Sequence, residues 1–116
     1  MNCEVEYTDE FELWWDTLNT EEQIAVTASV TLLERLGINL KYPYSSQIIG
    51  SKYRLRELRI QHKGKPYRIL YTFDPRRNAI LLIAGNKASK KRWYETNVPI
   101  AERLYEKHLQ QIEKEI

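Results

Sequence analysis

The order of hydrophobic and polar residues divides this 116-residue chain into a helical first half and a second half rich in strands. Residues 3–7 alternate, with both glutamates on one face, which predicts a short first strand. Residues 9–18 and 20–36 then carry apolar side chains at helical spacing. We therefore expect two helices joined as a hairpin, with acidic residues on its outside.

The second of these helices has a plain amphipathic pattern. Thr20 followed by Gln23 predicts a capping box at its start, and Gly37 stands where a left-handed residue would end it. We expect its buried face to be a stripe at steps of four residues, with one more leucine beside it: Ile24, Ala28, Leu32, Leu36 and Leu33.

Beyond an irregular stretch over residues 40–50, the period of the pattern changes from helical to two. Residues 53–60 alternate as a strand, but Leu55 and Leu58 are three residues apart, which indicates a bulge near Glu57. Residues 61–65, which contain a glycine, are expected to form a hairpin loop to the next strand.

That next strand covers residues 67–73, with its odd-numbered and even-numbered side chains on opposite faces. After a proline-containing turn, the apolar run 79–84 is typical of a central strand buried on both faces, and Gly85 is expected to end it. A last helix is expected to start around residues 97–99 and to run to the chain end. Its apolar stripe consists of Ile100, Leu104, His108, Leu109, Ile112 and Ile116.

The resulting order is strand, two helices, three strands and a helix. It predicts an α+β fold in which helices pack against an antiparallel meander sheet. A chain of 116 residues is large enough for one hydrophobic core, so we expect one domain spanning residues 1–116.

Charge is strongly segregated along the chain. Between Lys52 and Arg92 lie thirteen basic residues, and the only acids there are Glu57 and Asp74, a net charge of +11. The rest of the chain has five basic and fourteen acidic residues, a net charge of −9. A concentrated positive field favours polyanions, of which nucleic acid is the commonest, although a basic surface can also be no more than a solvated one.

Several classes of function have no support in the sequence. The two histidines, His62 and His108, stand apart and Cys3 is the only cysteine, so no metal site or disulfide is expected. There is no glycine-rich phosphate loop, and no cofactor is expected. The acidic N-terminus is unlike a signal peptide, and no apolar run approaches the roughly 20 residues that span a bilayer. We expect a cytoplasmic protein without membrane contact.

Three basic residues are expected to meet on the sheet. Arg68 lies on the polar face of its strand, and the hairpin should bring Arg59 close to it, while Lys87 follows the next strand. Clustered guanidinium groups suit phosphate oxygens and could stabilise charge on a phosphorane. The alternative is that one arginine, Arg59 above all, pairs with Glu57 or a helix carboxylate.

Tyr94 follows the basic loop and should lie near Lys87. A tyrosine crowded by cations would have a depressed pKa and could transfer protons, or it could stack on a base. As an ordinary aromatic residue it would do neither. Its neighbour Trp93 is expected to be the buried member of the pair.

Four segments in this order resemble the RelE/HigB toxins of bacterial type II toxin–antitoxin systems, and the phage-derived HigB-like branch in particular. They are residues 58–59, 66–74, 80–87 and 93–95. The resemblance implies a compact RelE-like fold and a metal-independent endoribonuclease that cuts mRNA in the ribosome. In such enzymes a 2′-hydroxyl attacks the adjacent phosphate.

The resemblance also implies roles for individual residues. Arg68 would hold the scissile phosphate, Lys87 would stabilise the transition state, and Tyr94 would assist proton transfer or stack on the base. The residues expected to bind RNA are Arg54, Arg56, Arg59, Lys90, Lys91 and Arg92. Relatives carry a pair of lysines where this chain has Leu55 and Glu57, so the general base stays unassigned.

A toxin of this kind implies an antitoxin, expected to be HigA-like with a helix-turn-helix domain. It could cover the basic groove or block entry to the ribosome from a distance. Two other functions stay open. A ParE-like toxin would inhibit DNA gyrase without cutting RNA, and a non-catalytic module would bind nucleic acid without toxicity.

Overall fold

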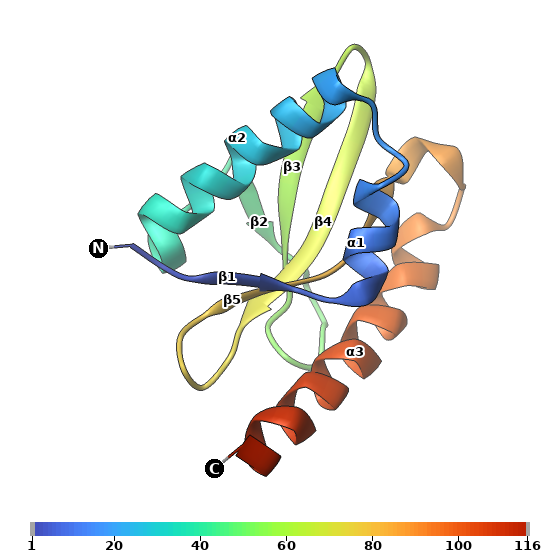
Figure 1. The fold of residues 1–116 in the computed structure, drawn as a ribbon. Helices are drawn as coiled ribbons and strands as arrows, with labels where there is room; N and C mark the ends of the chain where they lie inside the picture. Colours follow the sequence, from blue (N-terminus) through green and yellow to red (C-terminus); the bar gives the residue numbers. More distant parts are fainter. Residues whose placement is uncertain (1, 116) are drawn as a thin grey trace.

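The computed structural model describes residues 2–115 and contains a five-stranded sheet with helices on both faces (Figure 1). The strands are β1 (Val5–Tyr7), β2 (Ser45–Gln47), β3 (Arg56–His62), β4 (Lys65–Phe73) and β5 (Ala79–Asn86). Their order in the sheet is β1-β5-β4-β3-β2, with β1 parallel to β5 and every other pair antiparallel. The predicted α+β fold is confirmed, with the short edge strand β2 as an addition.

The helices are α1 (Asp9–Trp15), α2 (Thr20–Leu36) and α3 (Trp93–Glu115), with short 3-10 turns at Gly37–Asn39 and Lys87–Ser89. Helices α1 and α2 cover one face of the sheet and α3 covers the other (Figure 1). None of the helices within residues 2–115 is long and apolar enough to cross a membrane.

Burial on both faces of the sheet explains the irregular spacing of leucines before and within β3. Leu58 packs in the core under α2, whereas Leu55 packs in the core under α3. The register of β3 with β4 is continuous, so the predicted bulge near Glu57 is wrong. The irregularity in the sheet lies instead between Leu70 and Tyr71, in the pairing of β4 with β5.

The prediction for the buried face of α2 is wrong in part. Leu33 is buried and Leu32 is partly buried, as predicted, but Glu22 and Val26 are the other buried side chains. Ile24 is 65% exposed, Leu36 is 44% exposed, and Ala28 is exposed as well. Glu22 faces inward and accepts a hydrogen bond from the hydroxyl of Tyr67 on β4. The pattern of hydrophobic residues cannot show that a glutamate is buried.

The cap of the same helix lies one residue earlier than predicted. The Asn19 side chain accepts a hydrogen bond from the Glu22 backbone N–H, and the Glu22 carboxylate accepts one from the Asn19 N–H. Gly37 is the C-cap, as expected, with a positive φ of 53°.

The ends of the last strand and helix differ from the prediction. β5 continues through Gly85 to Asn86, and α3 begins at Trp93 with Pro99 inside it. Trp93 packs directly on Gly85, where an added Cβ would lie 2.7 Å from the indole nitrogen. This close contact, which needs a glycine, fixes the first turn of α3 over the end of β5. The predicted Ile116 lies outside the described residues.

Candidate active site

The hairpin between β3 and β4 brings two arginines together on the face of the sheet that α3 covers. Lys63 and Gly64 both have positive φ and form a tight turn, shorter than the predicted loop over residues 61–65. This turn sets Arg59 opposite Arg68, as expected from the sequence. The same face carries Glu57, two residues before Arg59 on β3.

Glu57 is the centre of the cluster, although sequence analysis considered it only as an ion-pair partner of an arginine and assigned it no catalytic role. Its side chain is buried, with 6% of the residue exposed. One carboxylate oxygen, Oε1, accepts a hydrogen bond of 2.6 Å from the Tyr94 hydroxyl, and the other accepts one of 2.7 Å from the Ser46 hydroxyl. An acidic residue in the middle of a basic strand was the available indication, but its partners come from β2 and α3.

Arg68 lies within ion-pair distance of this carboxylate and is itself buried. Its Nη1 donates to the Tyr67 carbonyl at 2.9 Å. Its Nε lies 3.5 Å from Glu57 Oε1, within ion-pair distance, but the alignment gives no hydrogen bond and this buried N–H has no partner among the described residues. Burying an unpaired donor costs free energy. The site therefore contains a cation with one N–H donor still available for a hydrogen bond.

Tyr94, in the first turn of α3, is protonated and not acidic. Burial and the hydrogen bond to Glu57 raise the pKa of Tyr94 to about 12, and the nearby Arg68 opposes this only in part. The prediction of a depressed pKa for Tyr94 is therefore wrong, because the nearest charge is a carboxylate. The expected proximity to Lys87 is confirmed, since Lys87 Nζ lies 6.0 Å from the centre of the Tyr94 ring.

Arg59 forms the outer wall of the cluster. Its Nη1 lies 3.4 Å from Glu57 Oε2, so the pairing with Glu57 that the sequence left open is present. Its guanidinium also lies 5.1 Å from the centre of the exposed Tyr42 ring. Glu57 is thus bracketed by two arginines, one buried and one at the surface.

The other residues predicted to bind RNA lie in three separate places. Lys90, Lys91 and Arg92 are exposed just before α3, near the cluster in sequence, and Arg92 pairs loosely with Glu95 at 3.6 Å. Arg56 points to the opposite face, where it donates to the Ser45 hydroxyl at 3.1 Å.

Arg54 is exposed and precedes β3. Its carbonyl accepts a bond of 3.3 Å from Thr72, toward the far end of β4. The structure therefore brings Arg59, Arg68, Lys87 and Tyr94 together, and separates Arg54 and Arg56 from them.

An open hollow of about 520 Å³ adjoins the cluster. Glu57 and Tyr94 form part of its lining, and Ile48, Ile49 and Val98 supply apolar walls. Ile49 is 91% exposed, an unusual position for an isoleucine. The hydrogen-bonded carboxylate and phenol therefore lie beside an accessible apolar surface.

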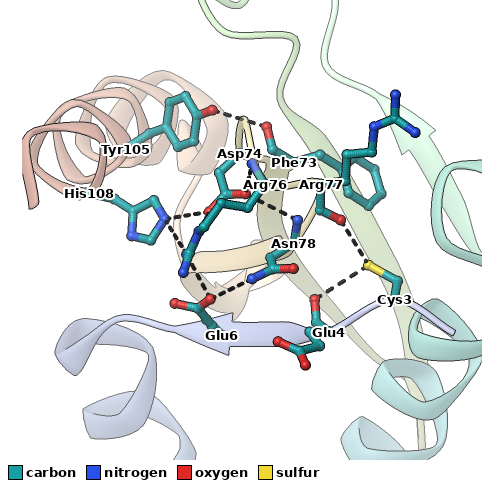
Figure 2. A network of polar contacts seen from close by, with 10 residues as sticks. All are labelled: Cys3, Glu4, Glu6, Phe73, Asp74, Arg76, Arg77, Asn78, Tyr105 and His108. Atoms are coloured by element: carbon teal, nitrogen blue, oxygen red, sulfur yellow. Dashed lines mark hydrogen bonds and ion pairs between the residues drawn. The ribbon is translucent and has the colours of Figure 1, made fainter. Parts of the chain in front are cut away.

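A second buried carboxylate, Asp74, has a different environment in the turn between β4 and β5 (Figure 2). It accepts hydrogen bonds from the backbone and side chain of Arg76, from the Asn78 N–H and, at 3.0 Å, shares one with His108 of α3. Burial acts to raise the pKa of Asp74, but the bonds from His108 and Arg76 outweigh it and hold that pKa below its usual value.

Among residues 2–115, no three histidine, cysteine, aspartate or glutamate side chains gather closely enough to hold a metal ion. The side chains available for chemistry at the cluster are a carboxylate, a phenol, two guanidinium groups and an amine. This set can accept a proton, donate a proton and stabilise negative charge.

The sequence matches the phage-derived Gp49-like protein family over residues 13–106. It is 41% identical over 100 residues to the putative toxin HigB3 of Mycobacterium tuberculosis, covering 84% of this chain and 86% of HigB3. It is also 37% identical over 103 residues to the putative toxin HigB2 of the same organism, covering 86% of this chain and 51% of HigB2. The chain thus spans about half the length of HigB2.

The fold is shared with a chain in the crystal structure of the intact E. coli RelBE toxin–antitoxin complex. The TM-score is 0.55 at 10% sequence identity, and the match covers 72% of this chain and 95% of that one. At this identity the likeness concerns the fold alone.

Proposed function

We propose that this chain, which belongs to the phage-derived Gp49-like family of RelE/HigB-type toxins, acts as a ribosome-dependent endoribonuclease that cuts mRNA. The observation that carries the proposal is the cluster of Glu57, Tyr94 and Arg68. There a hydrogen-bonded carboxylate and phenol lie beside a buried guanidinium that keeps an unpaired N–H.

The proposed reaction is attack of the 2′-hydroxyl on the adjacent phosphate. The new bond joins O2′ to phosphorus, the bond from phosphorus to O5′ breaks, and the products are a 2′,3′-cyclic phosphate and a 5′-hydroxyl. Glu57 accepts the proton of the 2′-hydroxyl, and Tyr94 donates its proton to the leaving O5′. Because the two side chains are hydrogen-bonded at 2.6 Å, the proton on Glu57 can then return to Tyr94 and restore both groups.

The basic residues would have different roles according to how deeply each is buried. Arg68, with 5% of its side chain exposed, would stabilise the developing negative charge from its buried position beside Glu57. The more accessible Arg59 and Lys87 would bind the phosphate oxygens directly. The hollow beside Tyr94 has room for a nucleoside, whose base would lie against Ile48 and Val98.

The partners follow from the same proposal. The exposed Lys90, Lys91 and Arg92 would contact mRNA or ribosomal RNA through the phosphates, and the protein would act in the cytoplasm. Because the E. coli structural neighbour comes from a toxin–antitoxin complex, we infer a cognate antitoxin here as well, of the HigA type with a helix-turn-helix domain.

The decisive experiment is to map RNA 5′ ends across the transcriptome minutes after induction of the protein. New ends should appear only in translated regions, in phase with codons. They should be absent with Arg68→Ala and present with the control Arg77→Ala, which removes an exposed arginine from the turn before β5. Arrested growth with unchanged RNA ends and altered plasmid topology would instead indicate inhibition of DNA gyrase.

A further inference from the structure

Two exposed tyrosines lie beside the Glu57 cluster and have no part in the proposed reaction. Tyr42 and Tyr44 belong to the turn that leads into β2, and they are 72% and 55% exposed. Their rings could be buried at little cost to their hydroxyl groups, yet the fold leaves both in solvent. Two exposed aromatic rings within three residues form an apolar patch, and such patches mark surfaces of contact with another molecule.

The backbone fixes this patch next to the cluster. β2 pairs with β3 so that Ser46 lies opposite Glu57, and two residues further along the Arg59 N–H donates to the Tyr44 carbonyl at 2.9 Å. Opposite residues of an antiparallel pair have their side chains on the same face, so Tyr44 shares the face of Arg59 and Glu57. The Tyr42 ring in turn lies 5.1 Å from the Arg59 guanidinium. Arg59 therefore contacts both the carboxylate and the aromatic patch.

The patch and the hollow lie on opposite sides of Glu57. Tyr44, Ser46 and Ile48 alternate onto one face, and of these Ser46 donates to Glu57 while Ile48 lines the hollow. Residues four apart in an extended chain are separated by about 13 Å. An RNA strand that crosses Glu57 would therefore have one base at the hollow and a neighbouring base at the tyrosines.

The chain around the patch carries no acidic side chain. Between Glu34 and Glu57 there is no aspartate or glutamate, whereas five basic residues lie there: Arg35, Lys41, Lys52, Arg54 and Arg56. Exposed aromatic rings beside cations are the combination that binds single-stranded nucleic acid, because the rings stack on bases and the cations attract phosphates. A duplex offers no such contact, since its bases are already stacked on one another.

We infer that Tyr42 and Tyr44 form a stacking platform for an unpaired base of the mRNA, across the scissile phosphate from the base in the hollow. The inference rests on the proposed function for the identity of the RNA. Arg59 would bind the phosphate between the two bases. With one base on each side of Glu57, the two nucleotides would be held apart and the phosphate between them exposed to attack. Because every base has an aromatic face, the platform would accept any of them.

The first test uses a short single-stranded RNA with 2′-O-methyl groups throughout, which cannot be cut because the attacking hydroxyl is absent. It is added to the full chain with isotope-labelled tyrosine, and the ring signals are followed by NMR. Stacking on a base should shift the signals of Tyr42 and Tyr44. Tyr7 is the control, because it is 58% exposed but lies on β1 at the opposite edge of the sheet. Its signal should not move, and the same RNA in a duplex should shift none of the three.

The second test compares variants that remove or keep the aromatic ring. Tyr42→Leu and Tyr44→Leu should each weaken binding of the uncut RNA, and lower kcat/KM for cleavage on ribosomes, by roughly fivefold or more. Tyr42→Phe and Tyr44→Phe keep the ring and should stay within about twofold. Tyr7→Leu makes the same change at the opposite edge of the sheet and should also stay within about twofold. Thermal unfolding of each variant verifies that it is folded.

A third test identifies which RNA supplies the base. Photoreactive bases are placed on either side of the cut in a message with a 2′-O-methyl group at that position, and the message is bound to ribosomes with the unaltered protein. The message should crosslink to the turn that contains Tyr42 and Tyr44. Crosslinks from this turn to ribosomal RNA alone would overturn the assignment to mRNA.

The outcomes separate the platform from the proposed ribonuclease. Ring signals of Tyr42 and Tyr44 that do not move with single-stranded RNA, or leucine variants that cut as fast as Tyr7→Leu, would overturn the platform and leave the ribonuclease proposal intact. Ring signals that respond to protein concentration and not to RNA would also overturn it, and would assign the patch to contact between copies of this chain. If RNA shifts both signals but the unaltered chain produces no new RNA ends, the platform stands and the ribonuclease proposal fails.

Discussion

Two buried carboxylates, Glu57 and Asp74, lie in very different surroundings. Asp74 accepts bonds from the Arg76 side chain at 2.7 and 3.0 Å, from two backbone N–H groups at 2.9 and 3.1 Å, and contacts His108 at 3.0 Å (Figure 2). Glu57 accepts two short bonds, from Tyr94 and Ser46, and a long one of 3.4 Å from Arg59, while Arg68 Nε lies 3.5 Å away without a hydrogen bond.

The difference lies in how fully the charged partners of each carboxylate are hydrogen-bonded. Asp74 joins the turn before β5 to α3, and through Arg76 it also joins Glu6 of β1, so its bonds tie three elements together. Such a saturated network stabilises a fold and leaves nothing for a ligand. At Glu57 a buried cation keeps an unpaired donor beside an accessible hollow, which is the arrangement of a site that acts on something else.

The largest expected effect is on catalysis, from Glu57→Gln. The amide keeps the shape of the side chain but does not accept the proton of the 2′-hydroxyl, so RNA cleavage on isolated ribosomes should fall by roughly 100-fold to 10,000-fold. The rate is measured with a synthetic message, at a protein concentration that saturates the ribosome. A cleavage rate within threefold of the unaltered protein would remove Glu57 from the mechanism.

The Ser46→Ala variant is the matched control for this measurement. It removes one hydrogen-bond donor to Glu57 but keeps the carboxylate, so the loss of rate should be much smaller. Amide spectra of both variants show whether Arg68, left without its counter-charge in Glu57→Gln, still allows the native fold.

Tyr94→Phe should have a smaller effect, roughly 10-fold to 100-fold, because only the proton donor is lost and the ring remains. The pH dependence tests the same role. A proton donor must stay protonated, and the pKa of Tyr94 is raised to about 12. Titration of Tyr94 should therefore not reduce the cleavage rate near pH 10, where an unperturbed tyrosine would ionise. A loss of rate near pH 10 that is absent from Tyr94→Phe would contradict this assignment.

Asp74→Asn should affect stability and not catalysis. Cleavage by the folded protein should be unchanged, and the free energy of unfolding should fall by roughly 2 kcal/mol. The sign of the pH effect follows from the lowered pKa of Asp74 in the folded state. The stability that ionised Asp74 contributes is present above its unfolded pKa of about 3.9 and is lost as pH falls through the lower folded value.

Urea unfolding of both proteins between pH 7 and pH 3 tests this prediction. The gap in unfolding free energy between the unaltered chain and Asp74→Asn should be constant from pH 7 to about pH 5 and should narrow below pH 4. The exposed Asp16→Asn change is the control and should show little effect. A gap that does not change with pH would mean that Asp74 stabilises by shape and not by charge.

Sequence analysis predicted those parts of the molecule that depend on local pattern. The alternation of β4, the pairing of Arg59 with Arg68 across a short hairpin, and the burial of Trp93 all follow from neighbouring residues. The proximity of Lys87 to Tyr94 follows in the same way, since a separation of seven residues in the chain limits the distance.

The centre of the site did not follow from local pattern. The partners of Glu57 come from β2, β4 and α3, and β2 has no hydrophobic alternation by which to recognise it. Glu22 on α2 is buried for a similar reason, because its carboxylate accepts a hydrogen bond from Tyr67 of β4, which is distant in the sequence. Buried charges are fixed by tertiary partners, so a pattern of hydrophobic residues assigns them to the surface.

The smallest expected effect tests the assignment of residues to faces of the sheet. Arg56→Ala and Lys91→Ala remove the same charge, but Arg56 donates to Ser45 on the α2 face and Lys91 is exposed beside α3. If RNA approaches the α3 face, Lys91→Ala should reduce the salt dependence of ribosome binding by about one phosphate contact, and Arg56→Ala should leave it unchanged. Equal slopes for the two variants would mean that the basic residues act through net charge and not through one face.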